Sequence, residues 1–108
     1  FVEKSEGNYK NAEKHLKKAV EIGQSATTYT KLTELYVEMG RKSKALQTIE
    51  KGISRNDHPD CKIKFAELAV KYQQKQKSGV SYLKSINTFD VDTQKKEKIN
   101  QLLAQLGS

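Results

Sequence analysis

The stretch GNYKNAEKHLKKAV, residues 7–20, returns 33 positions later as GRKSKALQTIEKGI, residues 40–53. Each copy begins with a glycine and then places apolar or small residues every three or four positions, the spacing of one face of an α-helix. The matched pairs are Gly7 and Gly40, Ala12 and Ala45, Leu16 and Ile49, Ala19 and Gly52, and Val20 and Ile53. A helix that is written twice with the same face predicts two successive units that pack in the same way.

The composition suits an elongated helical protein better than a compact single-core one. Of 108 residues, 35% are apolar and 31% are charged, with one proline and no tryptophan. This is few apolar residues for one large core. No apolar run approaches the roughly 20 residues of a membrane-spanning helix, so we expect no membrane span. Because the chain begins with Phe1 rather than Met, we expect a fragment of a longer chain, a soluble domain that is either cytoplasmic or exported.

Apolar periodicity predicts six helices joined by short breaks. The ranges are about 9–22, 27–39, 43–54, 59–74, 78–87 and, after Asp90 or Asp92, a last helix that ends near Gly107. Asp57 or His58 can cap the fourth helix, with Pro59 in its first turn. Connections of about 2–8 residues make neighbouring helices antiparallel. No single pair can bury its own apolar face, so we expect the pairs to stack side by side.

Residues 28–57, TYTKLTELYVEMGRKSKALQTIEKGISRND, carry the spacing by which this chain resembles the tetratricopeptide repeat. That repeat is a helix–turn–helix of about 34 residues with the pattern W-x2-L-G-x2-Y followed by A-x3-F. The matching positions are Tyr29, Leu32, Thr33 and Tyr36 in the first helix, Gly40 in the turn, and Ala45, Ile49 and Gly52 in the second helix. The resemblance implies an all-α, right-handed superhelical array of antiparallel helix pairs with a C-terminal capping helix.

The resemblance divides the single domain, residues 1–108, into four parts. Residues 1–24 are a partial first repeat, whose FVEKSE start resembles the tail of a first helix, and residues 25–58 are the full middle repeat. Residues 59–89 are a divergent third repeat, and residues 90–107 resemble a capping helix. The third repeat is matched by Phe65, Leu68, Ala69 and Tyr72, and then by Gly79, Leu83 and Ile86. Its turn is about two residues shorter than that of the middle repeat, so the array could be deformed there.

Arrays of this family bind an extended peptide or a partner helix in a concave groove lined by their first helices. The resemblance therefore implies a non-enzymatic scaffold for a protein or peptide partner. By register, the groove residues of the middle repeat are Thr27, Thr30, Lys31, Glu34, Val37 and Glu38. Those of the third repeat are Ile63, Ala66, Glu67 and Val70. An alternative role is a structural end-piece of a longer repeat array, which could self-associate through exposed array ends.

The net charge of +7 comes from 20 Lys and Arg against 13 Asp and Glu, and only two of the twenty are Arg. Lys14, Lys17 and Lys18, with Lys44 and Lys51 one unit later, form a basic face on the second helices. Such a face is a solvated surface or, in a third alternative, a dock for an acidic partner or an anionic polymer. It disfavours specific nucleic-acid binding, for which arginine is better suited.

No motif predicts catalysis, a metal site or a cofactor. The two histidines are His15, on a Lys-rich helix, and His58. The group DHPDC, residues 57–61, holds four potential ligands but lacks the second ligand pair of a structural zinc site. Helix capping by Asp57 and Asp60, with Cys61 packed as a small apolar residue, accounts for it. We therefore expect neither an enzyme nor a bound metal or cofactor.

Overall fold

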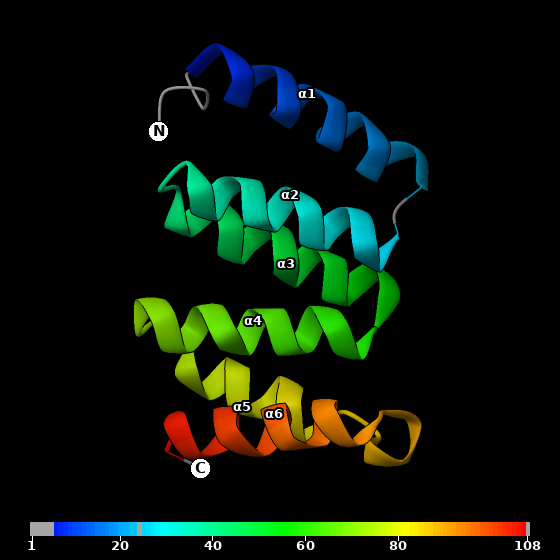
Figure 1. The fold of residues 1–108 in the computed structure, drawn as a ribbon, viewed down its shortest axis with the longest axis vertical. Coiled ribbons are helices and arrows are strands. Elements are labelled where there is room, and N and C mark those ends of the chain that lie inside the picture. The colour runs from blue at the N-terminus through cyan, green and yellow to red at the C-terminus, as the bar shows by residue number, and fades with distance from the viewer. Residues whose placement is uncertain (1–5, 24, 108) are drawn as a thin grey trace. The chain divides into compact units, whose positions relative to one another are not determined.

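The computed structural model describes residues 6–23 and 25–107, which form six α-helices and one short 3-10 helix without a strand (Figure 1). The predicted helix tail at the very start of the chain, residues 1–5, lies outside the described residues. The helices group into two compact units, one up to Asn56 and one from Asp57 onwards. The all-α fold of successive helix pairs that the sequence predicts is confirmed.

The first unit holds α1 (Glu6–Gly23), α2 (Ala26–Glu38) and α3 (Lys42–Asn56). α2 begins where Ser25 Oγ accepts the backbone N–H of Thr28 at 3.2 Å, which satisfies one of the free donors of the first turn. After α2 the chain turns at Gly40, whose φ of 76° is the left-handed conformation that favours glycine. α2 contacts both α1 and α3 and is therefore the central helix of this unit.

The positions of the repeat signature on α2 and α3 are all buried, together with three further apolar residues. On α2 the buried residues are Tyr29, Leu32, Thr33, Leu35 and Tyr36, and on α3 they are Ala45, Leu46, Ile49, Gly52 and Ile53. Thr33 is a polar residue among them, and its hydroxyl donates to the carbonyl oxygen of Tyr29 at 2.8 Å. The hydroxyl is thus satisfied within its own helix, and a threonine can stand at the small position of the signature.

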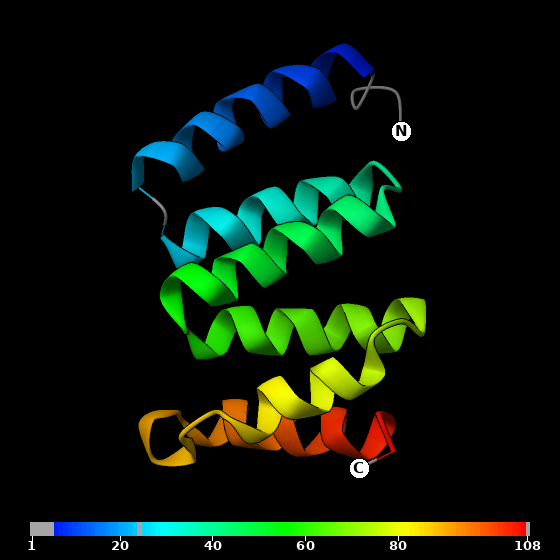
Figure 2. The ribbon, with the colours of Figure 1, turned by 180° about the vertical axis from the view of Figure 1, so that it is seen from behind.

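The second unit holds α4 (Pro59–Tyr72), α5 (Gln76–Lys84), the 3-10 helix η1 (Thr88–Asp90) and α6 (Thr93–Gln105). α4 contacts both α5 and α6, and Figure 2 shows the short α5 lying obliquely across α6. The buried cluster that joins the three helices consists of Ile63, Ala66, Leu83, Ile86, Ile99 and Leu102. His58 Nδ1 caps α4 by accepting the N–H of Asp60 at 3.1 Å, and Asp92 Oδ1 caps α6 by accepting the N–H of Lys95 at 2.8 Å.

Two helix ends of the second unit differ from the sequence expectation. α4 ends at Tyr72 rather than at 74, because Gln73 takes a left-handed φ of 54°, and Lys75 does the same. α5 ends at Lys84 rather than at 87, because the Ser85 hydroxyl donates to the carbonyl oxygen of Tyr82 at 2.6 Å and the chain then turns into η1. α4 thus ends through a left-handed backbone at Gln73, and α5 through a side-chain bond of Ser85, neither of which the apolar pattern alone reveals.

Candidate partner-binding surfaces

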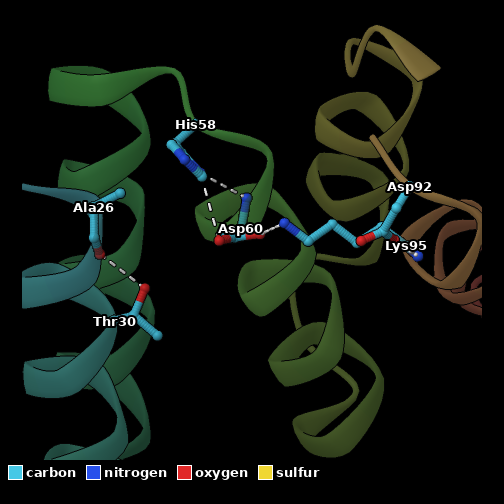
Figure 3. A network of polar contacts seen from close by, with 6 residues as sticks. All are labelled: Ala26, Thr30, His58, Asp60, Asp92 and Lys95. Atoms are coloured by element: carbon cyan, nitrogen blue, oxygen red, sulfur yellow. Dashed lines mark hydrogen bonds and ion pairs between the residues drawn. The ribbon is translucent and has the colours of Figure 1, made fainter. Parts of the chain in front are cut away.

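The exposed face of α2 carries the residues predicted to line a groove. Thr27, Lys31, Glu34 and Glu38 are exposed and follow one another at steps of four, three and four, so they form one line along the helix. Thr30 and Val37, half-buried, flank that line. The Thr30 hydroxyl donates to the carbonyl oxygen of Ala26 at 2.9 Å (Figure 3), which uses its proton but leaves its oxygen able to accept a bond.

One end of this α2 face opens into a hollow of about 430 Å³ at the turn that follows the helix. Its lining residues are Tyr9, Lys10, Glu38, Met39 and Arg41. The hollow combines an aromatic ring, a thioether and both signs of charge, so it can accept a mixed polar and apolar side chain of a partner. Glu38 is the predicted groove residue that lines it.

The second unit carries a groove between α4 and α6, made of two hollows of about 290 and 270 Å³. The first is lined by Asp60, Ile63, Glu67, Gln94, Lys95 and Lys98, and the second by Glu67, Val70, Lys71, Lys98, Gln101, Leu102 and Gln105. Glu67 and Lys98 belong to both hollows, because their ion pair separates them, with Lys98 Nζ 2.6 Å from Glu67 Oε2. The groove therefore has apolar residues along its length, charged bridges across it and glutamine amides along one edge.

A second ion pair crosses the groove at the start of the two helices. Lys95 Nζ lies 2.8 Å from Asp60 Oδ1, and the Asp60 carboxylate also lies 3.8 Å from His58 Nδ1, as Figure 3 shows. The hydrogen bond to Asp60 raises the pKa of Lys95 above its ordinary value, so the ammonium stays charged at neutral pH. The side chains of both bridges are between a third and a half exposed, so water or a partner's polar groups can reach and replace these contacts.

The structure places the residues predicted for the groove of the third repeat in two different settings, and α6 forms the other side of the groove. Ile63, Glu67 and Val70 line the groove, whereas Ala66 is fully buried beneath it in the cluster with Leu83. Sequence reasoning missed the α6 side because the helix was interpreted only as a cap. The available signal was a polar line at steps of four, three and four, Gln94, Lys98, Gln101 and Gln105.

The predicted basic face is partly neutralised around one carboxylate. Lys17 of α1 and Lys44 of α3 both approach Glu13 Oε2, at 3.3 and 4.0 Å, and Lys44 Nζ also lies 5.6 Å from the centre of the Tyr36 ring. Lys14, Lys18 and Lys51 are exposed. The structure thus draws two of the five lysines into a polar contact that joins α1, α2 and α3, and leaves three facing solvent.

Glu13 is also the acceptor of the hydrogen bond that joins α1 to α2. The Tyr36 hydroxyl donates to Glu13 Oε2 at 2.7 Å, and Tyr36 is only 3% exposed. This bond lowers the pKa of Glu13, with help from Lys17 and Lys44 and against the partial burial of the carboxyl. The pKa of Tyr36 is raised far above its ordinary value, chiefly by burial of the phenol and secondly by its hydrogen bond to Glu13. The phenol therefore keeps its proton and remains a donor.

Of the two residues predicted to cap α4, Asp57 and His58, the structure uses His58. Asp57 does not cap α4; it adopts a left-handed φ of 48° and places Oδ1 2.6 Å from Nζ of the buried Lys62. A hollow of about 200 Å³ lies beside this pair, with Ser85 and Asn87 on its wall. His58 takes over the cap, since the ion pair with Lys62 draws Asp57 away from the helix start.

Cys61 is buried, and within residues 6–23 and 25–107 no three His, Cys, Asp or Glu side chains gather as metal ligands would. In the same part of the chain, no helix has both the length and the apolar character needed to cross a membrane.

The chain also matches a known protein family by sequence. A family model of the tetratricopeptide repeat matches residues 2–23 and residues 26–58, which together are just over half of the chain. The second match covers the middle repeat from the start of α2 to the beginning of the second unit. Comparisons with curated proteins and with solved structures find no match. With its repeat signature buried in α2 and α3 as the family pattern requires, the chain belongs to the tetratricopeptide repeat family.

Proposed function

We propose that this chain is a non-enzymatic scaffold that holds an extended segment of a partner protein along the exposed faces of its first helices. Tetratricopeptide repeats generally mediate protein–protein interaction and are typically not enzymes. Two surfaces are candidates, the line on α2 in the first unit and the groove between α4 and α6 in the second. In this proposal residues 59–89 act as a third repeat and residues 90–107 as the capping helix.

The observation that carries the proposal is the composition of the groove between α4 and α6. Ile63, Val70 and Leu102 offer apolar contact, and Gln101 and Gln105 offer amides that can bond a partner's main chain. An extended peptide presents main-chain donors and acceptors along its length and side chains to alternate sides, so it suits such a surface. Affinity in a shallow groove of this kind should be modest, roughly micromolar.

Peptides selected from a random 12-residue display library provide the test. Each selected peptide is titrated against the parent chain and four charge variants by fluorescence anisotropy. Lys98→Glu changes the α4–α6 groove, and Lys96→Glu is its control, because Lys96 is exposed on the same helix but lines neither hollow. Glu34→Lys changes the α2 line, and Glu97→Lys is its control at an exposed site on α6.

We expect one groove variant to weaken binding at least about tenfold while its control stays within about twofold of the parent. Equal effects of Lys98→Glu and Lys96→Glu, and of Glu34→Lys and Glu97→Lys, would show that only net charge matters. That outcome would reject both groove surfaces.

The basic face is a second candidate, favoured by the exposure of Lys14, Lys18 and Lys51. It would attract an acidic partner or an anionic polymer at long range, with an affinity that falls steeply between low and physiological salt. Reversing these three charges should then abolish binding and leave peptides selected on the grooves unaffected. If the groove is the site, the same reversals mainly slow association.

A further inference from the structure

His58 caps α4 through a bond that exists only while its ring is neutral. The ring atom Nδ1 accepts the backbone N–H of Asp60 at 3.1 Å (Figure 3). A ring nitrogen accepts a hydrogen bond only when it carries no proton, and both nitrogens of a charged imidazolium carry one. Histidine is the side chain whose ordinary charge change falls between about pH 5 and pH 8. Protonation of His58 therefore removes the bond that caps this helix.

The His58 ring has a second contact, which protonation strengthens. Nδ1 lies 3.8 Å from Oδ2 of the Asp60 carboxylate, which is too far for a hydrogen bond, and in the neutral form both atoms are acceptors. A proton on Nδ1 turns this atom into a charged donor that attracts the carboxylate. The two side chains are 45% and 48% exposed, so each has room to turn towards the other. Protonation thus exchanges a bond to the Asp60 main chain for an ion pair with the Asp60 side chain.

The same carboxylate is the acidic half of a bridge across the groove between α4 and α6. Asp60 Oδ1 lies 2.8 Å from Lys95 Nζ, and this contact is the largest cause of the raised pKa of Lys95. Figure 3 shows the carboxylate between the imidazole of His58 on one side and the ammonium of Lys95 on the other. A positive charge on the imidazole therefore competes with Lys95 for one carboxylate.

The other acidic groups beside this network in the second unit are already engaged. Asp57 precedes His58 in the chain, but its carboxylate binds the buried ammonium of Lys62 at 2.6 Å. Asp92 of α6 stabilises the charge of Lys95 and accepts the N–H of that residue as the cap of α6. The carboxylate that responds to a charge on His58 is therefore that of Asp60.

We propose that His58 is a pH-sensitive switch for the groove between α4 and α6, an inference that rests on the function proposed for that groove. With a neutral ring, the cap holds Asp60 in the first turn of α4, and the carboxylate holds Lys95 across the groove. With a protonated ring, the cap is lost, the carboxylate turns towards the imidazolium, and the Lys95 ammonium becomes available to a ligand. A partner segment with a carboxylate at this end of the groove therefore binds more tightly at acidic pH.

An NMR titration of the ¹⁵N,¹³C-labelled chain from about pH 8 to about pH 5.5 tests the switch without a ligand. Histidines are the side chains that ordinarily change charge in this range. We expect the amide of Asp60 and the Cε of Lys95 to shift with the same midpoint as the His58 ring. Both shifts should disappear in His58→Asn, because asparagine caps a helix but does not titrate.

Two further variants show how the signal travels. Asp60→Asn has no carboxylate for the imidazolium and the ammonium to share, so it should abolish the shift at Lys95. His15→Asn replaces the other histidine of the chain and should leave the shifts at Asp60 and Lys95 unchanged.

A groove peptide then tests the consequence for binding. The probe is a peptide from the display library that contains Asp or Glu but no His, and that loses affinity on both Lys98→Glu and Lys95→Gln. By fluorescence anisotropy, we expect the parent to bind it at least about threefold more tightly at pH 5.5 than at pH 7.5. The two affinities of His58→Asn should agree within about 1.5-fold.

Several results would overturn the switch. One is that the resonances of Asp60 and Lys95 stay fixed while the His58 ring titrates, or still shift in His58→Asn. Another is that the parent binds the peptide equally at both pH values, or that His58→Asn shows the same pH dependence as the parent. If no library peptide responds to Lys98→Glu, the function proposed for the groove fails instead, and the NMR titration still decides whether His58 controls Asp60 and Lys95.

Discussion

Replacing Tyr36 with phenylalanine removes one oxygen atom and tests how α1 is held on α2. The Tyr36 hydroxyl donates to Glu13 Oε2 at 2.7 Å from a ring that is almost entirely buried. A hydrogen bond to a charged acceptor contributes about 1.5–3 kcal/mol. Glu13 keeps Lys17 and Lys44 nearby, and its side chain is 15% exposed, so water can replace part of the lost bond. We therefore expect Tyr36→Phe to lower the free energy of unfolding by about 1.5 kcal/mol.

Urea unfolding followed by far-UV circular dichroism measures this change, and amide hydrogen exchange in α1 and α2 shows where it acts. In a chain of this size the melting temperature should fall by roughly 5–10 °C. The control is Glu13→Leu, because the equivalent residue of α3 is the buried Leu46. In the Tyr36→Phe background this second change should restore stability, since replacing both partners by apolar groups is nearly neutral. The reasoning would be refuted if the changes in the free energy of unfolding caused by Tyr36→Phe and Glu13→Leu simply added in the double variant. It would also be refuted if Tyr36→Phe lowered that free energy by less than about 0.3 kcal/mol.

The same bond predicts a pH dependence. The folded state holds the pKa of Glu13 below its ordinary value, chiefly through the hydrogen bond from Tyr36. The contribution of Glu13 to stability is therefore fully present above the pKa of the unfolded chain, about 4.3, and is lost as pH falls through the lower folded value. The difference in the free energy of unfolding between the parent and Tyr36→Phe should accordingly become smaller as pH is lowered from about 5 to about 3. An unchanged gap over that range would contradict the assignment.

Three further substitutions test the packing. Ala45→Leu should destabilise the fold by about 1–3 kcal/mol in urea unfolding, because Ala45 is fully buried and a larger side chain must displace its neighbours. A neutral result would reject the repeat register. Gln73→Gly should stabilise the fold by about 0.5–1 kcal/mol and raise the melting temperature, because the φ of 54° at residue 73 suits glycine. An unchanged melting temperature would mean that the backbone at residue 73 is not strained. Gly79→Val should destabilise by about 1–3 kcal/mol in the same assay, because a Cβ added there would lie only 3.2 Å from Leu106 Cδ1 and 3.4 Å from Ala69 Cβ. Wild-type stability of this variant would argue against the close crossing.

The fold could be predicted because its determinants repeat along the sequence. Tyr29, Leu32 and Tyr36 are spaced as one helix face, and the structure buries all three. The small positions Ala45 and Gly52 follow on the next helix and are buried as well. These features depend only on periodicity and residue size, which a single sequence displays directly.

Parts that depend on which side chains meet in the folded unit could not be predicted. Asp57 and Lys62 are close in sequence, but the apolar pattern does not indicate that they form an ion pair or that Asp57 does not cap α4. The groove between α4 and α6 likewise requires Glu67 and Lys98, which are far apart in sequence, to meet at 2.6 Å. Such pairings follow from how the helices pack, and packing is decided by the whole unit.

The groove of the second unit depends on the packing beneath it. Gly79 of α5 approaches Ala66 and Ala69 of α4 so closely that its missing side chain leaves room for Leu106, which follows α6. Leu106 thus holds the end of α6 near the crossing of α4 and α5, close to Gln105 on the groove edge. Lys95, at the other end of α6, is held instead by Asp60. A larger residue at position 79 should therefore displace the Gln105 end of the groove more than the Lys95 end. If the groove holds a peptide as proposed, the contacts of that peptide near Gln101 and Gln105 should weaken before those near Lys95, although neither glutamine has been changed.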